Sequence, residues 1–332
     1  MADLTGARIG PYRVDGVIGA GGFATVYRAV DERLRADVAI QVLADNHSLE
    51  PAIRGRGIIA GHVLRRADGP TVLTVYDVGE TPSGAPYLVL ELADRGDLAR
   101  RRTQLVEAGW SPSDDDVRLL TDALSDALSR LHAAGIVHRD VTPRNLLIRS
   151  TTTDDGPATE LVGSGERLML GDLGLAKDLA ARSGLTVGGG TSGFAAPEQL
   201  RPGAVVDERA DVHGASASVI WLLTGDAPDP AGAWHRTPTL GSHPPALLDT
   251  LDRGVAIDPA DRPSSISGWH AEVAEALRPV SAPSRPARRR RAWVVAAIVL
   301  LALTVGVTVA MTRDEGDRPV TVVLDDGRVR AT

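Results

Sequence analysis

The chain has 332 residues, of which 43% are hydrophobic and 24% are charged. This composition excludes wholesale disorder, and the length exceeds the common single-domain size of about 100–200 residues. The absence of cysteine excludes disulfide bonds, cysteine-bound metals and a thiol nucleophile. The net charge is −7, and five of the 36 basic residues are arginines between Arg285 and Arg291. The rest of the chain is therefore more acidic still, which argues against a nucleic-acid partner.

The first motif is a glycine-rich turn between two predicted strands. An alternating stretch over residues 12–18 leads into GAGGF at residues 19–23, and a second alternating stretch begins at Thr25. Glycines let backbone N–H groups approach phosphates closely, although a plain hairpin turn has the same pattern. A strand rather than a helix follows the turn, which argues against a dinucleotide-binding βαβ unit.

Longer elements and further motifs follow. Apolar residues at helical spacing predict a helix over residues 119–131, and Gly225 is predicted to end another helix. The polar residues 150–165 predict a surface loop. Five motifs then place acidic, amide or basic side chains beside apolar stretches: HRDVTPRN at 138–145, LGDLG at 170–174, GTSGFAAPE at 190–198, DVH at 211–213 and DRP at 261–263.

With these motifs in this order, the chain resembles a bacterial Hanks-type serine/threonine protein kinase of actinobacterial character, over about residues 11–278. The resemblance implies catalytic roles for three polar side chains. Asp140 matches the base that accepts the proton of the substrate hydroxyl, and Asn145 and Asp172 match the ligands of Mg²⁺, which Mn²⁺ could replace.

The resemblance also implies an ATP site and a structural frame. The residues matched to ATP binding are Gly19, Gly21 and Gly22 over the phosphates, Ile18 just before them, Val26, Ala39 and Leu147 around adenine, Gln41 at the phosphate-contacting strand position, and Glu91 and Leu92 in the hinge. Glu198 and Arg262 match a buried ion pair, and Asp211 matches a brace under the catalytic loop. The segment 172–198 matches an activation loop, in which Thr186 is the expected phosphosite and Thr191 the expected partner of the catalytic aspartate. Arg139 matches the residue that pairs with a loop phosphate.

Two departures from the family pattern affect the expected activity. Gln41 stands where the family has a lysine that holds the α- and β-phosphates of ATP. Residues 51–67 contain no acidic side chain, and Ala60 takes the place of the helix glutamate that normally pairs with this lysine. A glutamate without its lysine would face the phosphates as a like charge, so the joint loss is physically coherent. The absence of a comparable preorganised charge typically lowers kcat on the order of 10²–10³-fold.

Other cations are candidates for the missing charge. In the N-terminal lobe these are Arg13, Arg28, Arg54 and Arg56. In the catalytic loop, Thr142 replaces a lysine of the family, and Arg144 occupies a position that carries an arginine in some tyrosine kinases. We expect the guanidinium of Arg144 to reach the region of the γ-phosphate.

The 20 residues from Ala292 to Met311 carry no charge. A helix of this length spans the roughly 30 Å hydrocarbon core of a bilayer. Trp293 and the arginine cluster lie at its N-terminal end, and the positive-inside rule then places the preceding residues in the cytoplasm and the tail outside. The sequence therefore predicts a single-pass protein of the cell membrane.

These observations predict an α+β chain with a two-lobed kinase fold and one C-terminal transmembrane helix. The predicted parts are a small β-rich lobe at 11–92, a mainly helical lobe at 93–278, a Pro/Arg-rich linker at 279–291, a transmembrane helix at 292–312 and a short external tail at 313–332. The predicted function is slow ATP-dependent phosphorylation of Ser or Thr in proteins, with substrate proteins, phosphothreonine-reading proteins or a second copy as partners. The alternative is a pseudokinase scaffold that binds proteins at the inner membrane face without turnover. A receptor-like relay is disfavoured, since the short tail offers little surface for a ligand.

Overall fold

The computed structural model describes residues 4–21, 24–43, 67–152, 156–172, 192–201, 203–230, 232–236 and 238–278. The chain divides into two units, Met1–Arg278 and Pro279–Thr332, and all described residues belong to the first. Within this described part, no helix has both the length and the apolar character needed to cross a membrane. The predicted linker, transmembrane helix and tail lie outside the described residues, as do Gly22, Ala60, Thr186 and Thr191.

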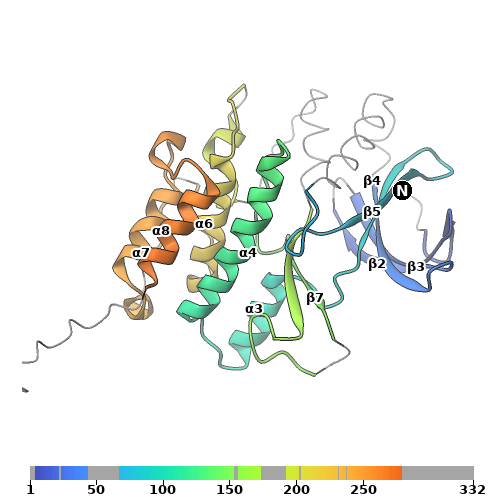
Figure 1. Cartoon of the computed structure of the whole chain (residues 1–332), viewed down its shortest axis with the longest axis horizontal. Coiled ribbons are helices and arrows are strands. Elements are labelled where there is room, and N and C mark those ends of the chain that lie inside the picture. Colours follow the sequence, from blue (N-terminus) through green and yellow to red (C-terminus); the bar gives the residue numbers. More distant parts are fainter. Residues whose placement is uncertain are drawn as a thin grey trace, which may run out of the picture. The chain divides into compact units, whose positions relative to one another are not determined.

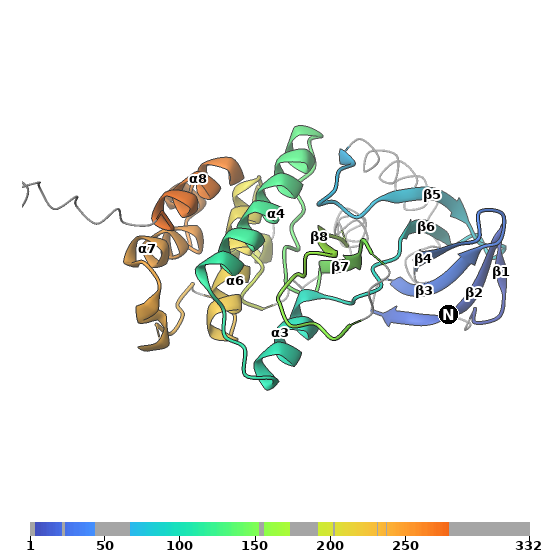
Figure 2. The same cartoon turned by 60° about the horizontal axis from the view of Figure 1, so that its bottom comes forward.

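A six-stranded antiparallel sheet forms the first part of this unit (Figure 2). Its strands run in the order β1-β2-β3-β4-β6-β5. Their bounds are β1 Arg8–Ile9, β2 Tyr12–Ala20, β3 Ala24–Asp31, β4 Ala36–Leu43, β5 Val75–Glu80 and β6 Pro86–Glu91. Alternation along β3 buries Tyr27 and Ala29 and leaves Arg28 exposed, because successive side chains point to opposite faces of a sheet.

Helices dominate the second part, in which α4 packs against α6 and α8, and α7 packs against α6 and α8 (Figures 1 and 2). The helices are α3 Leu98–Glu107, α4 Asp114–Ala133, α6 Arg209–Thr224, α7 Pro245–Gly254 and α8 Ile266–Ala276, with 3₁₀ turns at Pro197–Leu200, Pro238–Ser242 and Pro259–Asp261. The hairpin of β7 Leu146–Ser150 and β8 Glu166–Leu170 carries the end of the catalytic loop. The prediction of a β-rich lobe followed by a helical lobe is confirmed.

Local sequence explains where the two central helices begin and end. Ser113 caps α4 by accepting a hydrogen bond from the N–H of Asp116, whose side chain in turn accepts one from the N–H of Ser113. At the C-terminal end of α6, Gly225 adopts φ 93°, a left-handed conformation that glycine reaches without steric cost. Both helices were predicted from the sequence, and α4 extends beyond the predicted 119–131.

The segment after β7 was predicted to be a surface loop, and its described residues carry no helix or strand. However, Leu161 within it is completely buried in the core. Arg101 of α3 holds the segment by donating to the backbone oxygen of Leu161 and forming a two-bond ion pair with Glu166, each bond 2.7 Å. The loop is thus anchored to the helical lobe.

Backbone hydrogen bonds connect the two parts of the unit on one side of a cleft. The N–H of Leu73 donates to the oxygen of Leu170 at 3.0 Å, and the N–H of Leu170 donates to the oxygen of Thr71 at 2.8 Å. Further along, the N–H of Ile148 donates to the oxygen of Gly96 at 2.8 Å. The β7–β8 hairpin is therefore fixed to the segments before β5 and after β6.

Candidate active site

A cavity of about 560 Å³ lies between the sheet and the catalytic loop. The structure brings together at this cavity most of the residues that the resemblance assigned to nucleotide and metal: Ile18, Gly19, Val26, Ala39, Gln41, Glu91, Leu92, Arg144, Asn145, Leu147 and Asp172. Gly21 closes the adjoining β2–β3 turn by donating its N–H to the oxygen of Ala24 at 2.9 Å.

The walls of the cavity follow from strand alternation. Ala39 and Gln41 lie two residues apart on β4 and share one face, and Val26 on β3 pairs with Gln41. Leu147 on β7 lines the same cavity from the opposite lobe. These apolar side chains can enclose a flat aromatic ring, as expected for adenine.

The catalytic loop holds Asp140 and Asn145 together. The side-chain nitrogen Nδ2 of Asn145 donates to Oδ2 of Asp140 at 2.9 Å and to its backbone oxygen at 2.7 Å. Both hydrogen bonds use Nδ2, so Oδ1 of Asn145 is available to bind a metal ion. Oxygen is the ligand atom that Mg²⁺ prefers. Asp172, two residues after the end of β8, lines the same cavity.

A buried carboxylate under this loop fixes its shape. Asp211 is completely buried and accepts from the backbone N–H groups of His138 at 2.8 Å and Arg139 at 2.7 Å, and it bonds His132 Nε2 at 2.7 Å. Arg139 adopts φ 64° and Asp172 adopts φ 48°, left-handed conformations that non-glycine residues rarely take. Such strain costs about 1–3 kcal/mol per residue and is concentrated at functional sites.

His138 connects the two halves of the site. Its Nδ1 accepts from the N–H of Asp140 at 3.2 Å, and its Nε2 lies 3.2 Å from the backbone oxygen of Gly171. A neutral ring with the proton on Nε2 satisfies both contacts. The catalytic loop and the residue before Asp172 are thereby linked through one side chain.

Two of the four arginines proposed as substitutes for the lysine can be located. Arg28 lines the cavity, but its guanidinium pairs with Asp37 at 2.7 Å. Arg13 pairs with Asp15 at the start of β2. Both guanidinium groups thus have a carboxylate partner, while Arg54 and Arg56 lie outside the described residues. Arg144 is exposed at the mouth of the cavity.

The hinge carries a contact that the sequence did not predict. Glu91 is only 3% exposed, and its Oε1 accepts from both Arg149 of β7 and Arg167 of β8. The partners lie 58 and 76 residues from Glu91 in the sequence, so no local motif predicts these ion pairs. Other cavity residues that the sequence analysis did not identify are Leu73, Leu90, Ala93, Asp94, Gly96, Asp97 and Arg100.

The predicted structural ion pair is present in the helical lobe. Arg262 donates to Glu198 through two bonds of 2.7 and 2.8 Å, and both side chains are buried. Burial alone would raise the pKa of Glu198, but the hydrogen bonds and charge of Arg262 outweigh it and hold this pKa below its ordinary value.

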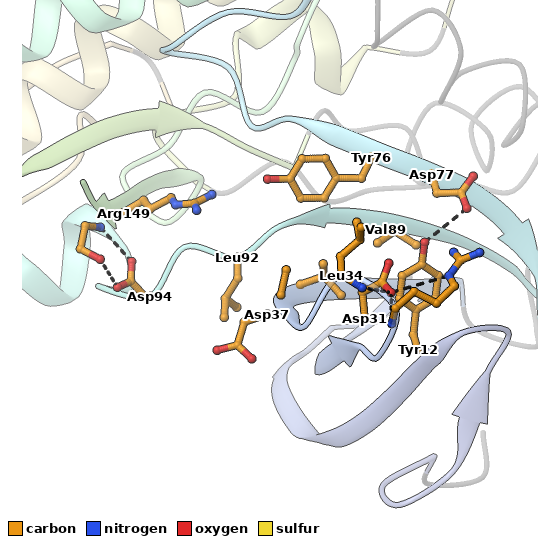
Figure 3. Close-up of a pocket in the computed structure, with 14 residues that line it drawn as sticks. Tyr12, Asp31, Leu34, Asp37, Tyr76, Asp77, Val89, Leu92, Asp94 and Arg149 are labelled. Atoms are coloured by element: carbon orange, nitrogen blue, oxygen red, sulfur yellow. Dashed lines mark hydrogen bonds and ion pairs between the residues drawn. The ribbon is translucent and has the colours of Figure 1, made fainter. Parts of the chain in front are cut away.

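Figure 3 shows a second cavity, of about 660 Å³, on the other side of the hinge. Its polar groups are bonded to one another or to neighbouring residues: Tyr12 donates to Asp77 at 3.3 Å, and Asp94 accepts from the N–H of Ser150 at 2.8 Å. Burial, followed by the charge of Asp77, raises the pKa of Tyr12 to about 12. Because its polar groups already have partners, this cavity is a weaker candidate for a charged nucleotide than the first.

Comparison with known proteins agrees with this geometry. The family model described as "Protein kinase domain" matches residues 12–244. The chain belongs to the protein kinase family. Among curated relatives, PknL of Mycobacterium tuberculosis (strain ATCC 25618 / H37Rv) is 35% identical over 219 residues, which cover 65% of this chain and 50% of PknL. PknJ of Mycobacterium bovis (strain ATCC BAA-935 / AF2122/97) is 30% identical over 247 residues, which cover 72% of this chain and 39% of PknJ.

Both relatives are named serine/threonine-protein kinases, and the chain spans about half their length or less. The solved kinase domain of Mycobacterium tuberculosis PknI (C20A mutant) shares the kinase fold, with a TM-score of 0.63 at 24% identity, covering 83% of this chain and 99% of that one. The prediction of a bacterial serine/threonine-type kinase domain is thus confirmed. The roles assigned to single residues, the membrane anchor and the reduced activity stay predictions.

Proposed function

We propose that the chain is a membrane-anchored serine/threonine protein kinase of reduced activity, which transfers the γ-phosphoryl group of ATP to protein hydroxyls. One observation carries this proposal: Asn145 and Asp172, from two different segments, line one cavity, and the side chain of Asn145 holds the carboxylate of Asp140 by a hydrogen bond of 2.9 Å. Three hard oxygen donors beside an apolar slot suit a magnesium-bound nucleotide.

In this function the hydroxyl oxygen of the substrate forms a bond to the γ-phosphorus of ATP while the bond from that phosphorus to the ADP oxygen breaks. Asp140 accepts the proton that the hydroxyl loses. The hydrogen bond from Asn145 keeps the Asp140 carboxylate in place. Asn145 and Asp172 would hold Mg²⁺, which neutralises phosphate charge when bound, and Mn²⁺ fits the same donors. Val26, Ala39 and Leu147 would enclose adenine, and the backbone of Glu91 and Leu92 would bind its edge.

Reduced activity follows from Gln41. Its amide can donate a neutral hydrogen bond to a phosphate, whereas a charge-assisted bond is roughly twice as strong. Of the arginines proposed as substitutes, Arg13 pairs with Asp15, and Arg28, which lines the cavity, pairs with the exposed Asp37. Contact of Arg144 with the γ-phosphate remains the prediction made from the sequence.

The wider setting is also proposed. Residues 292–312 anchor the chain in the cell membrane with the kinase domain in the cytoplasm and residues 313–332 outside, as the arginine cluster indicates. Its partners are substrate proteins, proteins that read phosphothreonine, and a second copy of the chain. Phosphorylation of Thr186 would give Arg139 a phosphate to bind.

A second candidate function is a pseudokinase scaffold that binds proteins at the inner membrane face without turnover. The joint absence of the lysine at position 41 and of acidic residues in 51–67 favours it.

Intact-mass analysis of the full chain after incubation with Mg²⁺ and ATP separates the two functions. We expect phosphate on the wild type and none on Asp140→Asn, since losing a general base typically costs about 10²–10⁴-fold in rate. No incorporation by a folded wild type, either into itself or into an added mixture of serine and threonine peptides, would overturn the kinase proposal and leave the scaffold.

A further inference from the structure

Two arginines from different segments lie at the mouth of the nucleotide cavity. Arg100 belongs to the first turn of α3, and Arg144 precedes Asn145 in the catalytic loop. The N–H of Ala99 donates to the oxygen of Pro143 at 3.3 Å, which joins the residues immediately before the two arginines. A backbone bridge between Asp97 and Leu147 joins the same segments on the inner side. The two guanidinium groups are therefore carried by adjacent backbone at one rim.

The side chains of Arg100 and Arg144 are exposed, and neither forms an ion pair with any residue that the structure describes. The other arginines of this region differ, because Arg28 is paired with Asp37 and Arg149 with Glu91. Asp97, at the start of α3, accepts from the backbone N–H of Arg100 at 2.8 Å as the cap of this helix. Carboxylates of Asp94 and Asp97 also line the cavity, but within the described part of the chain neither forms an ion pair with Arg100 or Arg144.

This rim lies beside the catalytic base. Arg144 is adjacent to Asn145, whose side chain bonds Asp140. A protein hydroxyl that reaches Asp140 must bring its flanking residues across the mouth of the cavity. An anionic side chain in those residues would meet two unpaired guanidinium groups, which bind carboxylates with charge-assisted hydrogen bonds.

We propose that Arg100 and Arg144 together select protein substrates with acidic side chains next to the phosphorylated serine or threonine. This inference rests on the proposed function and adds its substrate class. It gives Arg144 a role different from the γ-phosphate contact predicted from the sequence, although both roles need an anion. The γ-phosphate contact was predicted for Arg144 alone. A contribution of Arg100, which lies on α3 rather than in the catalytic loop, therefore distinguishes the binding of an acidic substrate from that contact.

Peptide binding tests the proposal without requiring turnover. The probes are three fluorescent peptides in which one threonine is flanked on each side by three glutamates, three glutamines or three lysines. Anisotropy with the full chain should give the glutamate peptide about tenfold tighter binding than the lysine peptide. Exposed ion pairs are modest, so Arg100→Ala and Arg144→Ala should each weaken glutamate-peptide binding about two- to fivefold. The double change to Arg100→Glu and Arg144→Glu should reverse the order of the peptides.

Arg8→Ala serves as the matched control, because Arg8 is an exposed arginine of β1 outside both segments. It should leave the preference intact. Equal binding of the glutamate and lysine peptides by the wild type would overturn the proposal, as would an acidic preference that survives the double reversal. Weakened ATP binding in Arg144→Ala with unchanged peptide binding would assign Arg144 to the γ-phosphate instead. If the chain prefers the glutamate peptide but transfers no phosphate, the proposed kinase function is wrong and the acidic-peptide site at Arg100 and Arg144 is supported.

Discussion

Gln41 of β4 lies directly opposite Val26 of β3 and opposite Leu88 of β6 in the sheet register. Its side chain therefore shares the face of Ala39 and enters the nucleotide cavity, where it is half-buried. The backbone that normally presents the phosphate-binding lysine is intact here, and only the charge is missing. The departure is thus local to one side chain within the described sheet.

The first prediction restores that charge. Gln41→Lys should raise kcat for phosphate transfer by at least tenfold, because a preorganised cation returns to a site where comparable contacts contribute about 10²–10³-fold. Gln41→Met, of similar length and uncharged, is the control and should not raise the rate. Radiolabel transfer to a threonine peptide measures both variants. An unchanged rate in Gln41→Lys would mean that another cation already serves the phosphates.

The site residues that could be predicted from the sequence each belong to a short motif of neighbouring residues. Asp140 and Asn145 lie five residues apart in one loop, so their hydrogen bond is local in the chain. Long-range contacts had no such signal. The pairing of Glu91 with Arg149 and Arg167, and the burial of Leu161 in a polar loop, depend on how distant segments pack.

The second prediction concerns the hinge. Glu91→Gln should lower the free energy of unfolding by about 1–3 kcal/mol, because it removes a charge that two half-exposed arginines contact. ATP affinity should fall severalfold as the backbone beside adenine loses its anchor to the β7–β8 hairpin. Urea unfolding and nucleotide titration measure the two effects. Asp37→Asn, which breaks only an exposed pair with Arg28, is the control and should change stability by less than about 1 kcal/mol.

The third prediction concerns the buried pair in the helical lobe. Glu198→Gln should destabilise the fold by about 3–5 kcal/mol, because Arg262 would keep a buried charge without its carboxylate. The double variant Glu198→Met with Arg262→Met should recover much of this loss, since replacing both charges avoids their desolvation. Because the pKa of Glu198 is held below its ordinary value, its contribution to stability is present above that value and is lost as the pH falls. Double-variant stability no better than that of Glu198→Gln would contradict this account.

The fourth prediction is a pH dependence from His213 of α6. Burial, followed by the charge of Arg262, lowers the pKa of His213 from 6.5 to about 4. Between these values the unfolded chain binds a proton that the folded chain excludes, so stability falls as the pH falls from 6.5 towards 4. The loss should reach about 3 kcal/mol and should be smaller in His213→Gln, whose side chain does not titrate. Urea unfolding of both proteins at a series of pH values measures the slope. Parallel curves for the two proteins over this range would show that His213 is protonated equally in the folded and unfolded chains.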